Sequence, residues 1–455
     1  MIHAFQSLGH NIVLDPASGS IHVVDDLTYT FLQKMEQGMT MMQARDSLAG
    51  SYQVTMLDDV MIDIQLLFGK GMLFTPWEDQ NIDINTQGVV KSLCLNIAHD
   101  CNLRCAYCFA GTGAFHGGRC LMPSEIGMKA LDWLIEKSGK RKHLEVDFFG
   151  GEPTVNFDAV KAVVSYGRQL EKVHNKEIRF TLTTNAYFIT DDMIDFINRE
   201  MANLVISLDG RPEVHDKLRP SPEGRGSHAQ ILANAKKLVG AREDKDYYIR
   251  GTFTRNNLDF AADVGYIFRN GFDQISVEPV VTDPRMPYSL LPEHLETIKA
   301  EYDRLASRML EGRSKGEWFN FFHFMLNLEN GPCAIKRLTG CGAGNEYVAV
   351  APDGSIYPCH QFVGESRWVM GNIQDGSFNV ALQEKFRNNN LLHKESCRDC
   401  WCRFYCSGGC AANAWHRNGD ISKPYFMECD IERKRIECAI GLQIAEMPEE
   451  KTRLQ

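Results

Sequence analysis

Cysteine constrains this chain more than any other residue type, because 15 of its 455 residues are cysteines and most of them lie in closely spaced groups. The first residues, Met1–Gln6, lack a basic segment followed by an apolar one, so we expect no secretory signal and a cytoplasmic location. In a reducing compartment, closely spaced cysteines are typical of metal ligands and not of disulfides. The sequence therefore predicts metal sites.

The composition disfavours two classes of partner. A formal net charge of −10 at pH 7 argues against nonspecific binding to nucleic acid or to anionic lipid. No run approaches the ~18 apolar residues of a membrane-spanning helix. We therefore expect no nucleic-acid partner and no membrane partner. With 44% hydrophobic residues, the chain can bury a sizeable core.

The chain divides into blocks of different pattern. Residues 1–88 predict two strands and three helices, and they carry 11 acidic against 3 basic residues. Residues 89–310 alternate strand-like and helical runs, which predicts an α/β fold with a parallel sheet, either open and doubly wound or a partial barrel. A linker over 311–332, a cysteine-dense region over 333–441 and a tail over 442–455 follow. The six predicted strands are Ser92–Ala98, Glu145–Phe149, Ile178–Thr184, Leu204–Leu208, Tyr247–Thr254 and Gln274–Glu278.

The first cysteine group, Cys101, Cys105 and Cys108, directly follows the first of these strands. Three thiolates can hold a cluster of four irons but leave one iron open for a substrate or cofactor. A structural zinc site needs four protein ligands, so zinc or a redox role is the weaker alternative. The CxxxCxxC spacing, the aromatic Tyr107 before the last cysteine and the position after the first strand resemble the radical S-adenosylmethionine (SAM) signature.

This resemblance implies a partial (β/α)6 TIM-type barrel with SAM bound at the carboxyl ends of the strands. In the family, the motif that matches Gly150, Gly151 and Glu152 receives the methionine ammonium group of SAM. Groups at later strand ends contact the ribose and the methionyl carboxylate. For two of the matching residues, Ser207 and Arg219, a structural role is almost as plausible. The residues that the resemblance assigns to cofactor binding are Tyr107, Gly150, Gly151, Glu152, Thr184, Asn185, Ser207 and Arg219.

A second cysteine group lies in the C-terminal region, and its spacing resembles the SPASM domain, which binds two auxiliary 4Fe-4S clusters. A zinc knuckle could explain the four cysteines between Cys397 and Cys410, but not the other three at their spacings. By motif position, one cluster takes Cys397, Cys400, Cys406 and Cys429, and the other takes Cys341, Cys359 and Cys410.

The number of ligands leaves one position undecided. Three cubane clusters offer twelve iron sites, SAM takes one, and the two motifs provide ten cysteines. Cys333 could supply the last ligand, as an upstream cysteine does in some relatives. The alternative is an iron open to a substrate thiolate. The remaining cysteines, Cys94, Cys120, Cys402 and Cys438, are expected to be buried or incidental thiols.

The N-terminal block resembles the winged-helix-like recognition element of enzymes that modify ribosomally made peptides (RiPPs). DNA-binding winged helices share this pattern, but a net charge of −8 over residues 1–88 would repel phosphate backbones. Such modules bind an extended leader peptide as an added strand on the hairpin edge. The acidic surface predicts a leader with several lysines.

Taken together, the three blocks resemble thioether-forming peptide maturases, in particular those that act on the cysteine-rich SCIFF peptides ("six cysteines in forty-five residues"). The stretches that carry this closer match are Asn11–Asp15, His22–Asp26, Gly340–Gly344 and Tyr357–Glu365. The resemblance implies that an external one-electron donor of flavodoxin or ferredoxin type drives cleavage of SAM to a 5′-deoxyadenosyl radical. The radical removes hydrogen from a peptide carbon, expected on threonine, and a cysteine sulfur then bonds to that carbon.

Two alternatives stay open. In sulfatase-maturing relatives an aspartate, as general base, follows the cysteine that corresponds to Cys359; here that residue is His360. Histidine can also accept a proton near neutral pH, so His360 is a candidate catalytic residue and formylglycine formation remains the alternative function. A structural role for His360 beside the cluster is slightly favoured over the catalytic one. A nonenzymatic iron-sulfur carrier is disfavoured because it needs no barrel with an open three-cysteine site.

Overall fold

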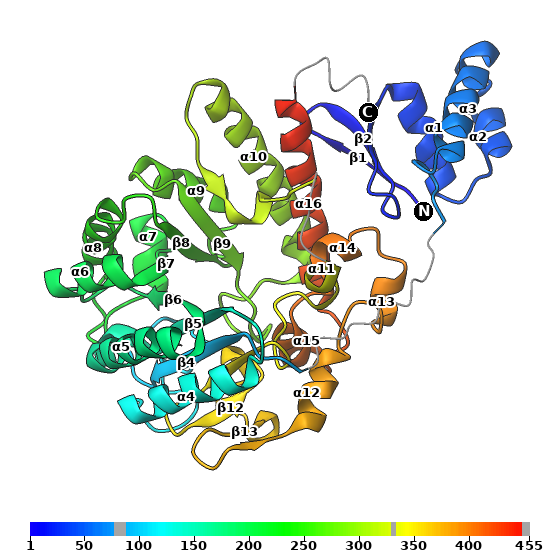
Figure 1. The fold of residues 1–455 in the computed structure, drawn as a ribbon. Coiled ribbons are helices and arrows are strands. Elements are labelled where there is room, and N and C mark those ends of the chain that lie inside the picture. The colour runs from blue at the N-terminus through cyan, green and yellow to red at the C-terminus, as the bar shows by residue number, and fades with distance from the viewer. Residues whose placement is uncertain (77–87, 329–333, 448–455) are drawn as a thin grey trace.

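The computed structural model describes residues 1–76, 88–328 and 334–447 (Figure 1). Within these residues, no helix combines the length and apolar character needed to cross a membrane.

The N-terminal module is a three-stranded antiparallel sheet in the order β1-β2-β3, followed by three helices. The sequence predicted only two strands, and β1 was missed because its polar residues give no clear alternation. Leu8 and Gly9 connect β1 to β2 with φ of 49° and 82°, a backbone geometry typical of a tight hairpin turn. The elements are β1 (His3–Ser7), β2 (His10–Leu14), β3 (Ile21–Val24), α1 (Asp26–Glu36), α2 (Met41–Leu48) and α3 (Val54–Gly69).

The central region contains all six predicted strands, and each is parallel to its neighbours in chain order. A doubly wound sheet would reverse its strand order, so this order identifies a partial barrel. The strands are β4 (Ser92–Ala98), β5 (His143–Gly150), β6 (Glu177–Thr184), β7 (Met201–Ser207), β8 (Asp246–Phe253) and β9 (Gln274–Pro279). The helices are α4 (Ser124–Lys137), α5 (Phe157–His174), α6 (Asp191–Glu200), α7 (Pro212–Leu218), α8 (His228–Gly240), α9 (Phe260–Arg269) and α10 (Leu295–Ser314), with the short η1 (Pro153–Asn156) and η2 (Pro292–His294).

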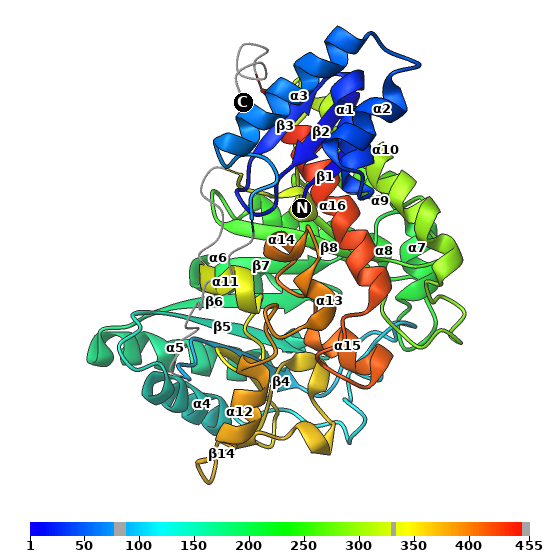
Figure 2. The ribbon, with the colours of Figure 1, turned by 90° about the vertical axis from the view of Figure 1, so that its right-hand side faces the viewer.

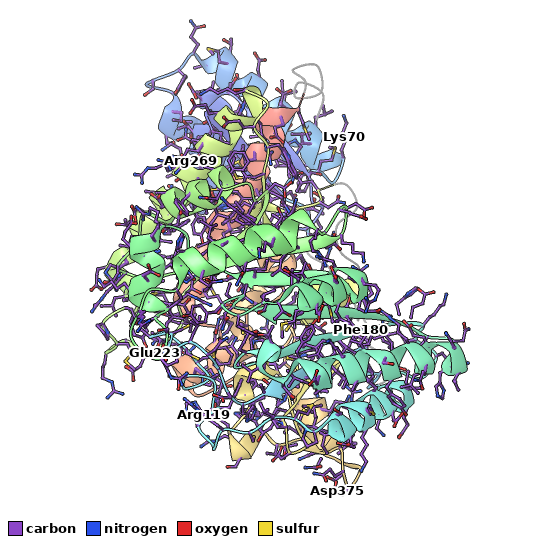
Figure 3. The ribbon with its side chains drawn as sticks, turned by 90° about the vertical axis from the view of Figure 1, so that its left-hand side faces the viewer. Lys70, Arg119, Phe180, Glu223, Arg269 and Asp375 are labelled. Atoms are coloured by element: carbon purple, nitrogen blue, oxygen red, sulfur yellow. The ribbon has the colours of Figure 1, made fainter. Side chains whose placement is uncertain are left out.

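The two faces of the barrel sheet differ. Helices cover the outer face (Figure 3), and the strand residues on that side are buried, as Ile249 and Phe253 of β8 show. The alternate residues of β8, which include Arg250, are partly or largely exposed. The concave inner face, called the lumen below, is therefore polar and open to solvent.

The C-terminal region extends the same sheet, because β11 (Tyr347–Val350) pairs in parallel with β4. The other strands are β10 (Asn320–Phe321), which pairs with β9, and β12 (Ser355–Tyr357), β13 (Gly371–Asn372) and β14 (Ser377–Phe378). The helices are α11 (Ala334–Thr339), α12 (Val380–Arg387), α13 (Glu395–Arg398), α14 (Arg403–Cys406), α15 (Ala411–Asn418) and α16 (Phe426–Glu446), with η3 (Phe322–Phe324), η4 (His360–Phe362) and η5 (Ser366–Trp368).

Helix α16 lies between the N-terminal module and the barrel helix α10 (Figure 2). A side chain at Gly441 would come within 2.1 Å of the Ser7 hydroxyl of β1, so the helix and the module are in close contact. The predicted boundaries at residues 310 and 441 both fall inside helices, since α10 runs to Ser314 and α16 to Glu446. Because α16 is covered on two sides, its buried residues fall on several sides of the helix, and no single apolar face marks the helix in the sequence.

Candidate functional site

The thiols of Cys101, Cys105 and Cys108 meet in the loop after β4, where they line a cavity of about 150 Å³. Burial, the carboxylate of Glu152 and the two neighbouring thiols raise the pKa of Cys101 to about 12. A thiol with such a pKa stays protonated near neutral pH unless a metal binds its sulfur. The other predicted cofactor residues line the same cavity: Tyr107, Gly150, Gly151, Glu152, Thr184, Asn185, Ser207 and Arg219.

Two glycines at the end of β5 allow this loop to pack closely. Gly150 has a φ of +129°, and a side chain there would lie 2.4 Å from the carbonyl oxygen of Ala98. A side chain at Gly151 would lie 2.3 Å from the carbonyl oxygen of Asp100. Since backbone atoms cannot move aside, both positions require glycine, and they hold the cysteine loop against the cavity.

Glu152 is 1% exposed, and its carboxylate accepts hydrogen bonds from neighbouring strand ends. The hydroxyl of Thr184 and the amide N–H of Asn185 each donate to it at 2.7 Å, and the hydroxyl of Thr154 donates at 2.8 Å. Burial raises the pKa of Glu152 in spite of these bonds. The Asn185 side chain also lies 3.6 Å from the Cys101 sulfur. Glu152 therefore holds the ends of the neighbouring strands in place, and this role does not depend on a bound ligand.

Arg219 presents a buried cation to the same cavity. Its Nη1 donates to the Tyr107 hydroxyl at 2.8 Å, and that hydroxyl donates to the Asp209 carboxylate at 2.6 Å. Behind it, the His215 ring lies 3.0 Å from the Ser227 hydroxyl, which donates to the Arg219 carbonyl oxygen at 2.6 Å. The Arg219 Nε is buried and has no hydrogen-bond partner among the described residues. A buried guanidinium with a spare N–H is suited to an anionic ligand such as a carboxylate.

The seven C-terminal cysteines of the second motif form two groups in space. In one group, burial, together with the nearby thiols of Cys410 and Cys341, raises the pKa of Cys359 well above its ordinary range. In the other, burial and nearby Glu428, with smaller effects of Cys397 and Cys400, raise the pKa of Cys429 to about 11. Cys406 belongs to this second group because its thiol interacts with Cys429. Cys333 lies outside the described residues.

Family models match the two parts of the chain that carry these sites. Residues 95–247 match the radical SAM superfamily, and residues 341–401 match the SPASM iron-sulfur cluster-binding domain. This chain is a radical SAM enzyme.

The enzyme is similar to several characterised proteins. It is 29% identical over 349 residues to the cysteine-type anaerobic sulfatase-maturating enzyme of Clostridium novyi (strain NT), covering 71% of this chain and 89% of that protein. The solved structure of native anSMEcpe with bound AdoMet and Cp18Cys peptide matches with a TM-score of 0.64 and 22% identity, covering 78% of this chain and 98% of that one. Streptococcus suis SuiB bound to precursor peptide SuiA matches with a TM-score of 0.52 and 17% identity, covering 93% and 97%.

The residues of the radical SAM enzyme fit its expected cofactors. Soft sulfur donors in sets of three and four suit iron-sulfur clusters. The same described residues contain no group of three His, Cys, Asp or Glu side chains arranged to hold a single metal ion. Cys101, Cys105 and Cys108 would hold one cluster, and the spare N–H of Arg219 would meet the carboxylate of SAM. When bound, the iron-sulfur cluster and SAM would together supply the chemistry of hydrogen-atom abstraction.

His360 connects the two halves of the radical SAM enzyme. Its Nδ1 lies 3.1 Å from the Tyr347 hydroxyl, and its ring lies 4.7 Å from that of Phe149 and 5.6 Å from that of Phe109. Both phenylalanines line the cysteine cavity, whereas Cys359 next to His360 belongs to a C-terminal group. Burial and the positive charge of Arg250 lower the pKa of His360 to about 4, so the ring is neutral.

The structure adds one residue, Asp209, to which the sequence assigned no role. Its carboxylate accepts a hydrogen bond from the hydroxyl of Tyr107, which also accepts one from Arg219. The sequence assigned Tyr107 only to cofactor binding. Asp209 lies two residues after the end of β7, in a polar segment, and this position was the one sequence signal available. Burial raises the pKa of Asp209, and Arg219 and Tyr107 oppose this shift. The remaining cysteines lie apart from the cavity: Cys94, Cys402 and Cys438 are buried and Cys120 is exposed.

Proposed function

We propose that this enzyme installs intramolecular thioether cross-links in a ribosomally made, cysteine-rich precursor peptide of SCIFF type. Each cross-link joins a cysteine sulfur to a carbon of an acceptor residue, expected to be threonine. The carbon gives up a hydrogen atom to the 5′-deoxyadenosyl radical and the thiol gives up a proton. An auxiliary cluster, when bound, would accept the one electron that leaves the product. Three 4Fe-4S clusters, SAM and an external flavodoxin- or ferredoxin-type donor complete the reaction.

The observation that carries the proposal is the position of the three-thiol group of Cys341, Cys359 and Cys410. His360, next to Cys359, packs on phenylalanines that line the SAM cavity. An iron that is short of a protein ligand at this group would hold a substrate thiolate close to the carbon radical. Coordination of this kind lowers the pKa of a thiol and fixes its sulfur. Cys333 as the last ligand is the alternative.

The N-terminal module supports a peptide substrate. A sulfatase-maturating structure covers 78% of this chain and SuiB covers 93%. Residues 1–76 make up about one sixth of the chain, so the SuiB match extends into the module. SuiB binds a precursor peptide. We therefore assign leader binding to a winged-helix-like recognition element within residues 1–88.

The surface of the module suits a leader with apolar and basic residues. Strand β3 is the edge of its sheet, and an edge strand can pair with an extended peptide. On helix α3, Ile62, Leu66 and Phe68 are 61%, 56% and 58% exposed. The same helix carries the exposed or half-buried carboxylates of Asp58, Asp59 and Asp63. Leader affinity should fall as salt rises, because part of it is electrostatic.

The residues of the chain then have distinct tasks. Cys101, Cys105 and Cys108 hold the first cluster, and Arg219 holds the carboxylate of SAM. Glu152 orients the strand ends and meets the ammonium group. The rings of Phe109 and Phe149 exclude water from the cavity, which protects a reactive radical from side reactions.

A formylglycine-forming sulfatase maturase is the second candidate, favoured by the 29% identity to the Clostridium novyi enzyme. In this second function His360 would act as the general base, because a neutral imidazole can accept a proton from a substrate thiol. The two candidates predict different products from different peptides.

Mass spectrometry separates them. The reconstituted enzyme, SAM and a reductant are incubated anaerobically with a cysteine-rich peptide encoded beside the enzyme, or with a sulfatase-derived peptide. The proposal expects loss of two hydrogen atoms per bridge and protection of one thiol from alkylation. An aldehyde on the sulfatase peptide, with the cysteine-rich peptide unchanged, would establish the second candidate instead. The Cys105→Ala variant controls for chemistry that does not need the cluster.

A further inference from the structure

An arginine in the lumen has no task in the chemistry described so far. Arg250 lies on the inner face of β8, directly opposite Ser207 of β7 in the strand register. Ser207 lines the SAM cavity, and adjacent strands lie about 4.8 Å apart. Arg250 is therefore within side-chain reach of the place where hydrogen is removed.

Arg250 is also loosely held. Its side chain is 51% exposed, although it belongs to a central strand. Its side chain forms no hydrogen bond with any residue that the structure describes, and its nearest ion-pair oxygen is that of Glu278 at 3.8 Å. Arg211, by comparison, donates to Asp263 at 2.7 Å and to Asp259 at 2.8 Å. A guanidinium with five donors and no short hydrogen bond has free capacity for a ligand.

Glu278, by contrast, is held in place from behind. Its carboxylate lies 3.5 Å from a guanidinium nitrogen of Arg435 on α16, and Arg435 donates to the Tyr302 hydroxyl at 3.0 Å. Although burial opposes ionisation, His323, Arg435 and Arg250 bring the pKa of Glu278 to about 2. The carboxylate is therefore charged and held near the end of β9, while the Arg250 guanidinium beside it is half exposed and makes no short contact.

We propose that Arg250 and Glu278 form a clamp for the main chain of the substrate peptide beside the reacting carbon. The guanidinium donates to a peptide carbonyl oxygen, and the carboxylate accepts from a peptide N–H. The pair is neutral as a whole, so it matches an uncharged peptide group, which offers one acceptor and one donor. A substrate carboxylate would gain from Arg250 but meet the charge of Glu278. This inference rests on the proposed peptide-modifying function.

The clamp gives the enzyme a means of positioning its substrate independent of the leader. Hydrogen abstraction needs the reacting atoms held close and oriented, and main-chain bonds fix a peptide without selecting its side chains. Neighbouring residues of the peptide can then vary while the reacting carbon keeps its place.

Binding of a core peptide without its leader tests the clamp. The reconstituted enzyme with SAM is titrated with a fluorescent core peptide, using wild type, R250Q, R250K and E278L. We expect R250Q to weaken binding roughly 10-fold or more, the loss of a charged hydrogen bond, and R250K to retain part of it. Arg179, on the inner face of β6 and paired with Asp246 at 3.2 Å, provides the control, and R179Q should bind like wild type.

Peptides with single N-methyl groups identify the contact. Methylation of the clamped peptide N–H should weaken binding to wild type but not weaken it further in E278L, because leucine has no acceptor for that N–H. Unchanged core binding by R250Q would overturn the clamp. A loss that appears only with peptides carrying an acidic side chain would also overturn it, in favour of carboxylate recognition. Cross-linking by the wild type is measured separately, so failure of the proposed function remains distinct from failure of the clamp.

Discussion

The buried hydroxyl of Tyr107 should control the affinity for SAM, although it has no direct role in the chemistry. It accepts from Arg219 at 2.8 Å and donates to Asp209 at 2.6 Å, so it fixes the guanidinium in the cavity. The Y107F variant removes both hydrogen bonds and keeps the ring. It leaves only the ion pair between Arg219 and Asp209, at 3.9 Å.

The magnitude follows from the bonds lost. A hydrogen bond to a charged group contributes about 1.5–3 kcal/mol, which corresponds to roughly 10- to 150-fold in a dissociation constant. Since the ion pair with Asp209 remains, we expect the lower end of this range, about tenfold weaker SAM binding. The R219Q variant removes the cation itself and should weaken binding at least as strongly.

Isothermal titration of the anaerobically reconstituted enzyme with SAM measures the effect. The matched control is Tyr166, whose hydroxyl donates to Asp132 at 2.7 Å on the exposed surface, and Y166F should bind SAM like wild type. Iron per chain and the unfolding temperature are measured on every variant, so that loss of the cluster or of the fold is recognised. If Y107F binds SAM as tightly as wild type and contains the full amount of iron, the hydrogen bonds of Tyr107 do not position Arg219 for SAM binding.

Two further predictions concern the loop and the module. In G151A the new methyl group would meet the carbonyl oxygen of Asp100 at 2.3 Å, so iron bound per chain should fall, while G118A, with open space around it, should bind iron like wild type. Burial disfavours the charged form of His3, but hydrogen bonds to Glu36 and Glu437 outweigh it and raise the pKa of the imidazole. The stabilisation by the charged imidazole is therefore fully present below about pH 6.5 and is lost as the pH rises through the pKa of the folded protein. Thermal unfolding from pH 6 to 9 should therefore show a decline in stability that H3Q lacks; equal profiles for the two proteins would contradict the assignment.

Motif spacing predicted the parts of this enzyme that depend on short segments. Cys101, Cys105 and Cys108 had to meet because they lie within eight consecutive residues of one loop. The six barrel strands were predictable because strands buried on one side have strong apolar patterns. The grouping of Cys359 with Cys341 and Cys410 came from family resemblance, since no local pattern brings distant cysteines together.

The sequence could not show contacts that arise only when distant elements meet. Tyr107 and Asp209 lie about a hundred positions apart, and neither carries a mark of its bond to the other. The same holds for Arg250 and Glu278 on neighbouring strands. Strand β1 has no clear alternation of its own, and its buried Phe5 belongs to one apolar cluster with Ile436 and Ile440 of α16, at the other end of the chain.

Helix α16 joins three functions in one rigid element. Near its start, Cys429 belongs to the four-thiol group of the SPASM region. Six residues further on, Arg435 holds the carboxylate of Glu278 in the lumen. On another face, Ile436 and Ile440 pack against the strands of the N-terminal module. Because a helix rises 1.5 Å per residue, these contacts lie within about 18 Å along one axis. The helix therefore sets the distance between the proposed leader-binding module and the proposed clamp, and with it the span that a substrate peptide has to cross.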